Sequence, residues 1–313
     1  MRTSRARIQR RRLTALGIVG AVAAVAGIAV GAGHGGSAND GGGARRADKP
    51  PPPPELPRGG RTIFPRYRVV AFYGAPQAAA LGQLGIGTPD KAARKLIAQA
   101  RRYERPRRPV LEAMELIATV ANRDPGMDGL YRSQQSAAVV RRYLRAARRH
   151  KMLLVLDIQP GHADFLDEAR HLRRWLREPD VGIALDPEWH TPGLVPGTAI
   201  GSVDAAKVNE VAAYVSGIVR RNRLPQKLFV VHQFVPDMIQ GKAAVVRPPG
   251  LAMTMNVDGF GTRANKVSKY RQFTHDGTRF YNGYKLFYHE DTGLMKPRQV
   301  LRLRPPPDLI VYE

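Results

Sequence analysis

The amino-acid sequence predicts an α/β fold, a closed parallel (β/α)₈ barrel of the TIM-barrel kind, behind an N-terminal export or anchor segment. Short apolar runs alternate with amphipathic stretches of helical period from about residue 65 onward. Alternating strands and helices form parallel sheets, because each helix returns the chain to the starting edge of the sheet. Eight runs between residues 65 and 313 fit the ~250 residues that such a barrel needs. A doubly wound open sheet is the main alternative.

The predicted strands are the short apolar runs themselves. In chain order they cover residues 68–74, 108–120, 151–161, 181–190, 227–234, 250–259, 283–291 and 308–313. The predicted helices lie between them at residues 89–103, 133–151, 163–178 and 204–222. Each helix carries arginines on one face, which we interpret as the solvated outer surface of the barrel.

The N-terminus has the pattern of an export signal. Six arginines in the first twelve residues precede an uncharged segment at residues 13–33. A helix of this length spans the ~30 Å of a bilayer core at ~1.5 Å per residue. Residues 1–33 are therefore predicted to be a cleaved signal peptide or a membrane anchor, and either places the rest of the chain outside the cytoplasm. Residues 34–64 are predicted to be a disordered Gly- and Pro-rich linker, and residues 65–313 the barrel domain.

Composition excludes several classes of function. The 313 residues include 50 Lys and Arg against 26 Asp and Glu, giving a net charge of +24, and no cysteine. Disulfides, zinc–thiolate sites, iron–sulfur clusters and a cysteine nucleophile are thereby excluded. Arginine supplies 39 of the 50 basic residues, a skew that GC-rich coding produces without selection for binding. No nucleic-acid recognition motif accompanies the charge, so we expect no nucleic-acid partner, whereas an anionic envelope surface fits it.

Polar side chains gather at the carboxyl ends of the predicted strands, where barrel enzymes carry their chemistry. They are Glu115, Asp157, Gln159, Asp186, Glu188, His190, His232, Gln233, Asn256, Asp258 and Glu313. Strand alternation places Asp157, Asp186 and Asp258 on the face opposite the branched apolar residues, and therefore toward the barrel interior. A single such residue is explained by the turn that follows a strand. Their number favours one site at the barrel mouth.

The segment GIALDPEWH, residues 182–190, is the sharpest local feature. If Asp186 and Glu188 both belong to a strand, they point the same way, ~6.5–7 Å apart along the chain at ~3.3 Å per residue. Paired carboxyl groups raise the pKa of one member and can supply a general acid near neutral pH.

This segment resembles the fourth-strand motif D-G-x-D-x-D-x-E of chitinase-like, family-18 glycoside hydrolases, which are (β/α)₈ barrels. The resemblance implies that Asp186 is the last Asp of the motif and that Glu188 protonates the glycosidic oxygen. In that family the N-acetyl group of the substrate is the nucleophile, positioned by this Asp. Val181 and Ala184 occupy the two earlier Asp positions. We therefore extend the resemblance to barrel glycosidases in general.

The predicted function is that of an exported or membrane-tethered glycoside hydrolase acting on an envelope or extracellular glycan. Glu188 is the expected acid, and Asp258, Glu115 or Glu313 the nucleophile or base of a two-carboxylate mechanism. The expected substrate-binding residues are Glu115, Gln159, Trp189, His190, His232, Gln233, Tyr288 and Glu313, with Asp157 and Asp186 assisting catalysis. The alternative is a catalytically silent barrel that binds such a glycan.

No cofactor is expected. Residues 84–91 contain glycines but neither GxGxxG nor a GK[ST] ending, so we expect no nucleotide partner. Four residues of metal-ligating type lie near strand ends, namely Asp157, His190, His232 and Asp258. They lack the HxH or HExxH spacing of common metal sites, so the prediction is no metal, with a divalent ion on these four as the lesser alternative.

Overall fold

The computed structural model describes residues 52–275 and 280–313. The predicted signal or anchor at residues 1–33 and most of the predicted linker lie outside this part of the chain. Among the described residues, no helix has the length and apolar character needed to cross a bilayer.

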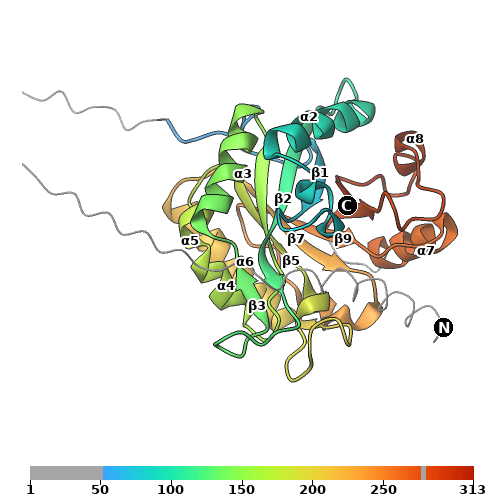
Figure 1. Cartoon of the computed structure of the whole chain (residues 1–313). Helices are drawn as coiled ribbons and strands as arrows, with labels where there is room; N and C mark the ends of the chain where they lie inside the picture. The colour runs from blue at the N-terminus through green and yellow to red at the C-terminus, as the bar shows by residue number, and fades with distance from the viewer. Residues whose placement is uncertain (1–51, 276–279) are drawn as a thin grey trace, which may run out of the picture.

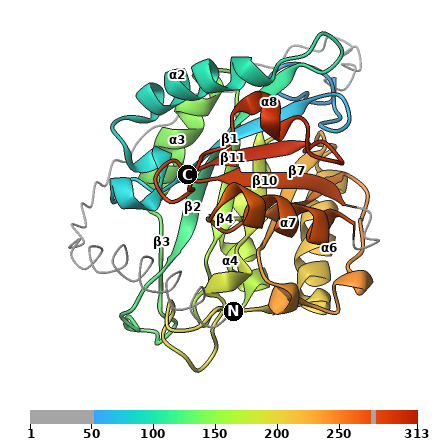
Figure 2. The same cartoon turned by 90° about the vertical axis from the view of Figure 1, so that its right-hand side faces the viewer.

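Eight parallel strands close into a barrel, as predicted, because β1 pairs with β2 on one side and with β11 on the other (Figures 1 and 2). The barrel strands are β1 (Arg68–Gly74), β2 (Val110–Ala121), β4 (Leu153–Ile158), β5 (Val181–Leu185), β7 (Lys227–Gln233), β9 (Leu251–Val257), β10 (Tyr281–Leu286) and β11 (Leu309–Tyr312). Each predicted run overlaps one of them, although β10 begins two residues before its run and β2 ends one residue after its run, and they follow one another around the barrel in chain order. The doubly wound alternative is wrong, because an open sheet would leave β1 and β11 as edges.

Three short strands stand outside the barrel. β3 (Arg132–Gln134) pairs antiparallel with the end of β2, and β6 (Val203–Asp204) pairs with β8 (Ile239–Gln240). The sequence assigns residues 133–136 to a helix, but the helix begins only at Ala137. Ser136 has extended backbone and its hydroxyl accepts a hydrogen bond from the Val139 amide, so it caps the helix rather than belonging to it.

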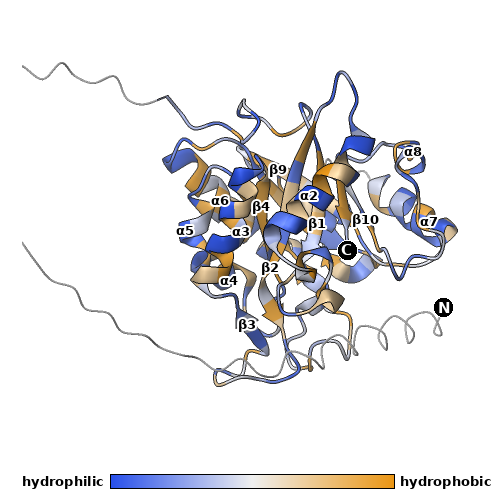
Figure 3. Ribbon diagram, turned by 45° about the horizontal axis from the view of Figure 1, so that its top comes forward, coloured by the Kyte–Doolittle hydropathy of each residue, from blue (hydrophilic) through white to orange (hydrophobic). Residues whose placement is uncertain are grey.

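Helices cover the outside of the barrel. They are α2 (Pro89–Ala100), α3 (Ala137–Arg149), α4 (Phe165–His171), α5 (Arg173–Leu176), α6 (Ala205–Arg221), α7 (Arg263–Thr274) and α8 (Pro297–Val300). The 3₁₀ turns are η1 (Ala79–Leu81), η2 (Gln83–Gly85), η3 (Arg101–Tyr103), η4 (Pro187–Trp189), η5 (Pro236–Met238) and η6 (Lys242–Ala244). The helix predicted at residues 163–178 is interrupted at Leu172. Polar outer faces and apolar strands are visible in Figure 3.

Strand alternation divides the core into two layers. Val181, Ile183 and Leu185 of β5 pack in the layer between strands and helices, as predicted. Gly182 and Ala184 face the barrel interior, and a Cβ on Gly182 would lie 2.5 Å from the Leu228 carbonyl oxygen. Small residues on this face therefore let neighbouring strands approach one another, while the branched residues bury apolar area against the helices.

The amino end of the barrel is closed by residues 56–67, which we call the plug. Leu56, Ile63 and Phe64 are at most 3% exposed and join the interior core. The amides of Ile63 and Phe64 donate to the Gln226 side-chain oxygen, at 2.7 and 3.3 Å. The predicted linker, residues 34–64, therefore extends too far toward the C-terminus. Its residues from Leu56 onward belong to the barrel domain, because Leu56, Ile63 and Phe64 pack in the interior core.

Candidate functional site at the barrel mouth

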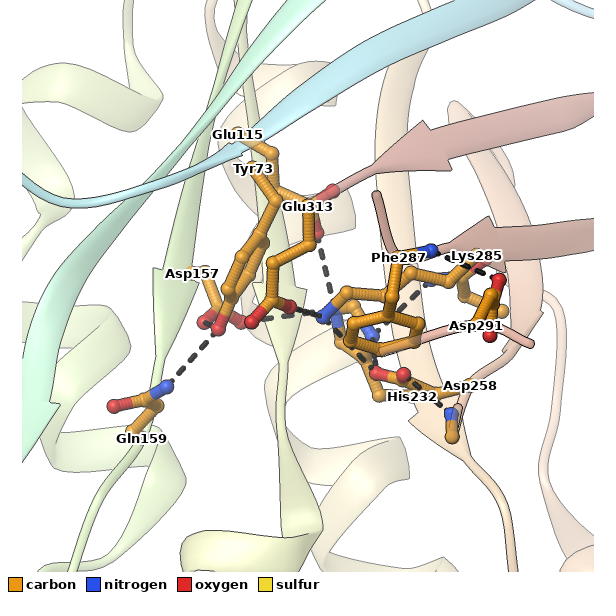
Figure 4. Close-up of polar contacts among 12 residues, drawn as sticks. Tyr73, Glu115, Asp157, Gln159, His232, Asp258, Lys285, Phe287, Asp291 and Glu313 are labelled. Atoms are coloured by element: carbon orange, nitrogen blue, oxygen red, sulfur yellow. Dashed lines mark hydrogen bonds and ion pairs between the residues drawn. The ribbon is translucent and has the colours of Figure 1, made fainter. Parts of the chain in front are cut away.

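Every barrel strand places a polar side chain at the carboxyl end of the barrel, in the strand or one residue after it, and Figure 4 labels all of these residues except that of β5. In chain order these residues are Tyr73, Glu115, Asp157, Asp186, His232, Asp258, Lys285 and Glu313. All except Glu313 are at most 3% exposed, and the Glu313 side chain is 25% exposed. The mouth is therefore a largely buried cluster of eight polar side chains, five of which carry carboxyl groups, and we call it the mouth cluster.

His232 lies in the middle of the mouth cluster. Its Nδ1 is 3.0 Å from an Asp258 carboxylate oxygen, and its Nε2 is 3.0 Å from a Glu115 oxygen and 3.9 Å from Asp157 Oδ1. The Asn256 amide nitrogen lies 3.2 Å from His232 Nδ1. Burial by itself lowers the pKa of this imidazole, but the hydrogen bonds with Asp258 and Glu115 outweigh it, so the pKa is raised well above its usual value.

Lys285 is the second buried cation. Its ammonium lies 2.7 Å from Glu313, 3.2 Å from Asp258 and 3.7 Å from the centre of the Tyr73 ring. Burial lowers the pKa of Lys285, but the charges of Asp258 and Glu313 raise it by more than burial lowers it, so the net shift is upward. The charged ammonium is favoured, and it is placed to orient the carboxylates of Asp258 and Glu313.

Asp157 is held by one oxygen only. Its Oδ2 accepts a hydrogen bond from the Tyr73 hydroxyl at 3.0 Å, and that hydroxyl accepts one from the Gln159 amide at 3.0 Å. Its Oδ1 is buried and has no hydrogen-bond partner within the described part of the chain. Burial raises the pKa of Asp157 to about 7, despite the opposing charge of His232.

Asp186 and Glu188 lie side by side, but not on one strand. β5 ends at Leu185, and Pro187 starts η4, so Glu188 belongs to a 3₁₀ turn for which Asp186 is the N-cap residue. Proline lacks the amide that would continue the parallel ladder, which explains why the extended spacing expected for the pair does not apply. Asp186 is 1% exposed and Glu188 8%. Burial raises the pKa of Asp186 well above its usual value, and the Glu188 charge raises it further.

The remaining predicted site residues lie around the mouth cluster rather than in it. His190 Nδ1 contacts the Ser202 carbonyl at 2.7 Å, and the Gln233 amide donates to the Val235 carbonyl at 3.3 Å. Trp189 is buried beside Glu188, at 9% exposure. The Tyr288 ring stacks on Tyr312 with centroids 5.1 Å apart, in the layer between strands and helices.

Sequence reasoning missed Lys285, although a signal for it was present. Gly283, Lys285 and Phe287 share one strand face by alternation, and a lysine in an otherwise apolar run needs a buried partner. Lys266 of α7 was also missed. Its ammonium contacts Asp291 at 3.0 Å and donates to the Lys285 carbonyl at 2.8 Å, which ties α7 to the strand that carries Lys285.

A cavity of about 330 Å³ opens beside the segment that carries Glu188. Its lining is Thr198, Ala199, Ile200, Gly201, Ser202, Val235, Asp237 and Gln240. The Gly201 amide donates to the Glu188 backbone carbonyl at 2.8 Å, so the cavity wall and the Glu188 turn are directly joined.

One set of mouth residues has the geometry of metal ligands. Glu115, Asp157 and His232 each offer one potential ligand atom, a carboxylate oxygen or an imidazole nitrogen, and these three atoms lie within 4.8 Å of one another. Of the four residues that the sequence offered as the lesser alternative, only Asp157 and His232 belong to this set. Asp258 contacts the other imidazole nitrogen, and His190 is bound to Ser202.

Comparison with known proteins gives no family assignment. No protein-family model matches the chain, and no curated protein matches it significantly. Among solved structures, the chain is similar to a sialic acid aldolase of Ruminococcus gnavus, with 11% identity and a TM-score of 0.39 over 79% of this chain and 68% of the other. It is also similar to a 5-methylcytosine deaminase of Klebsiella pneumoniae, with 9% identity and a TM-score of 0.32 over 73% and 53%. Fold and site together define an α/β-barrel protein with a charged mouth.

Proposed function

We propose that this protein is an exported or membrane-tethered glycoside hydrolase that cleaves an envelope or extracellular glycan by carboxyl general acid–base catalysis at the barrel mouth. The observation that carries the proposal is the Asp186–Glu188 pair. Asp186 is buried, and its Oδ1 has no hydrogen-bond partner among the described residues. Burial and the charge of Glu188 both raise the pKa of Asp186, so Asp186 retains the proton that an acid-catalysed step needs.

Glu188 is the proposed donor to the glycosidic oxygen. It is the less buried member of the pair, and it stands on the turn that borders the cavity. Asp186 lies deeper in the barrel, where it retains a proton that it can pass to Glu188, and it positions the Glu188 side chain. The resemblance of residues 182–190 to the family-18 strand motif implies the same role for Glu188.

Glu313 is the proposed base or nucleophile among the three expected candidates. Glu115 and Asp258 are both at most 2% exposed and contact His232, whereas the Glu313 side chain reaches solvent and is oriented by Lys285. A second carboxylate is required in either a retaining or an inverting mechanism. The neighbouring cavity, at about 330 Å³, has the volume for part of a sugar chain.

The test is hydrolysis of envelope polysaccharides by the full chain, measured as new reducing ends. We expect Glu188→Gln to lower turnover by ~10²-fold or more with little change in substrate binding, because amide replaces acid without changing shape. Glu210→Gln on the outer face of α6 is the matched control and should leave turnover unchanged.

Full activity of Glu188→Gln would show that Glu188 is not the acid. If the wild-type chain binds glycan and cleaves none, the protein is instead the silent glycan-binding barrel.

A further inference from the structure

Three side chains from different barrel strands point at one place in the mouth cluster. Glu115 of β2, Asp157 of β4 and His232 of β7 are each at most 1% exposed. His232 Nε2 is 3.0 Å from Glu115 Oε1 and 3.9 Å from Asp157 Oδ1. The proposed glycosidase mechanism assigns none of these three groups a role.

The distances fit ligands that share an ion. Oxygen and nitrogen ligands lie ~2.0–2.2 Å from a zinc-sized cation. At ~2.1 Å, two ligand atoms are ~3.0 Å apart when they subtend a right angle at the ion, and ~3.9 Å apart at a wide angle of ~135°. Both separations around His232 therefore fall in the range that one coordinated ion produces.

Asp157 supplies an independent observation. Its Oδ2 is occupied by the Tyr73 hydroxyl, while its Oδ1, on the His232 side, is buried with no hydrogen-bond partner in the described chain. A buried carboxylate oxygen without a partner is unfavourable, and such groups in folded proteins commonly face an ion or a water.

His232 is oriented as a metal-binding histidine is. Asp258 contacts Nδ1 at 3.0 Å, which directs Nε2 toward Glu115 and Asp157. A carboxylate on the far nitrogen of a ligating histidine fixes the ring and strengthens its electron donation. Lys285 in turn fixes Asp258, at 3.2 Å.

We propose that Glu115 Oε1, Asp157 Oδ1 and His232 Nε2 bind a divalent transition-metal ion at the barrel mouth, and that the ion displaces the proton of His232 Nε2 to solvent. One imidazole and two carboxylates form a mixed donor set, which suits Zn²⁺ or Mn²⁺, and three protein ligands leave positions open for water or a substrate oxygen. The proposal replaces the sequence expectation of no metal. It does not depend on glycan hydrolysis, because it concerns binding of the ion itself.

The experiment is metal binding to the full chain after removal of metals with a chelator. Titration calorimetry with Zn²⁺ and with Mn²⁺, together with elemental analysis, should give one bound ion per chain. Asp157→Asn, which keeps the side-chain shape, should weaken the affinity at least 10-fold. Asp167→Asn, an exposed matched control on α4, should bind as the wild type does. Asp258→Asn should lower the metal affinity 10- to 100-fold, the usual range for loss of a carboxylate that orients a ligating histidine.

Cobalt provides a measurement that needs no variant. Co²⁺ added to the metal-free wild-type chain should give visible absorption that Zn²⁺ abolishes by competition. If Asp157→Asn does not fold, as judged by circular dichroism, Glu115→Gln takes its place. Absence of a bound ion in the wild type, or unchanged affinity in the ligand variants, would overturn the proposal and identify the cluster as a metal-free ion-pair network. Neither result depends on whether the chain cleaves glycan.

Discussion

The two ends of the barrel both bury charged side chains, but they satisfy them in different ways. At the amino end, the Lys227 ammonium donates to the Glu178 and Val181 carbonyls at 2.7 Å each, and Arg68 donates to the Pro307 carbonyl at 3.1 Å. At the carboxyl end, Lys285 and His232 are held by carboxylates. Among the described residues, four of the five buried side-chain oxygens without a hydrogen-bond partner lie at that end, on Asp157, Asp186, Gln233 and Asn256, and the fifth is the Tyr214 hydroxyl of α6.

The charged groups at the amino end contribute to stability, whereas those at the carboxyl end form the candidate site. Backbone carbonyls at the amino end accept the hydrogen bonds of Lys227 and Arg68, and the buried Glu112 carboxylate there is paired with Arg58 of the plug at 2.6 Å. The carboxyl end keeps competing carboxylates close together, which is costly unless a proton, an ion or a substrate compensates. Barrel proteins generally place their sites at this end, and the mouth cluster follows that rule in its energetics as well as its position.

Lys285→Met gives the largest expected effect. It leaves Asp258 and Glu313 without their ammonium partner, and removing one member of a buried ion pair typically costs ~3–5 kcal/mol. Urea denaturation should show the loss in the free energy of unfolding. Lys207→Met on the surface is the control, expected to change stability by less than ~1 kcal/mol. Equal stability of Lys285→Met and wild type would mean that the mouth carboxylates do not need this cation.

Lys227→Met at the opposite end should change the pH dependence of stability instead. Burial lowers the pKa of Lys227 from 10.5 to about 7. Between these two pH values the unfolded chain holds the proton and the folded chain does not, so stability rises with pH by at most ~1.4 kcal/mol per unit. Below pH 7 both states are protonated and this contribution is constant.

The measurement is thermal unfolding of wild type and Lys227→Met from pH 6 to pH 10, compared as a difference. The free energy of unfolding of the variant minus that of wild type should fall steadily from about pH 7 upward, because only wild type gains stability there. A difference that is independent of pH would refute a neutral Lys227 in the folded state.

Glu188→Gln should give the smallest effect, a local change in titration. The Glu188 charge is one cause of the raised pKa of Asp186, so its removal should lower that pKa while burial keeps it above the usual value. Carboxyl carbon NMR of wild type and variant measures the shift. An unchanged Asp186 titration would mean that the two groups are not coupled and would remove the basis for the proposed acid pair.

Sequence patterning predicted the barrel and much of its mouth for a simple reason. Alternation along a strand fixes which side chains face inward, so Asp157, Asp186 and Asp258 could be placed together without knowing any distance. Lys285 was missed because alternation identifies a face but not the partner that makes a buried lysine acceptable. The Asp186–Glu188 geometry was missed in detail because Pro187 replaces strand with a 3₁₀ turn.

The plug was missed for a different reason. Residues 52–60 are rich in proline and glycine, and no periodicity distinguishes such a stretch from a spacer. Burial of Ile63 and Phe64 depends on tertiary partners, among them Gln226 before β7 and the ring of Tyr281, whose centroid lies 4.7 Å from that of Phe64. Local sequence contains no information on such distant contacts.

The plug also determines where the N-terminal part of the chain joins the barrel. The first described residues lead into the plug at the amino end, where the Arg61 guanidinium donates to the Arg223 and Leu224 carbonyls at 2.9 Å each. The chain before residue 52 therefore joins the barrel at the end opposite the charged mouth. A long polymer that approaches the mouth does not meet the point where that preceding chain joins the barrel.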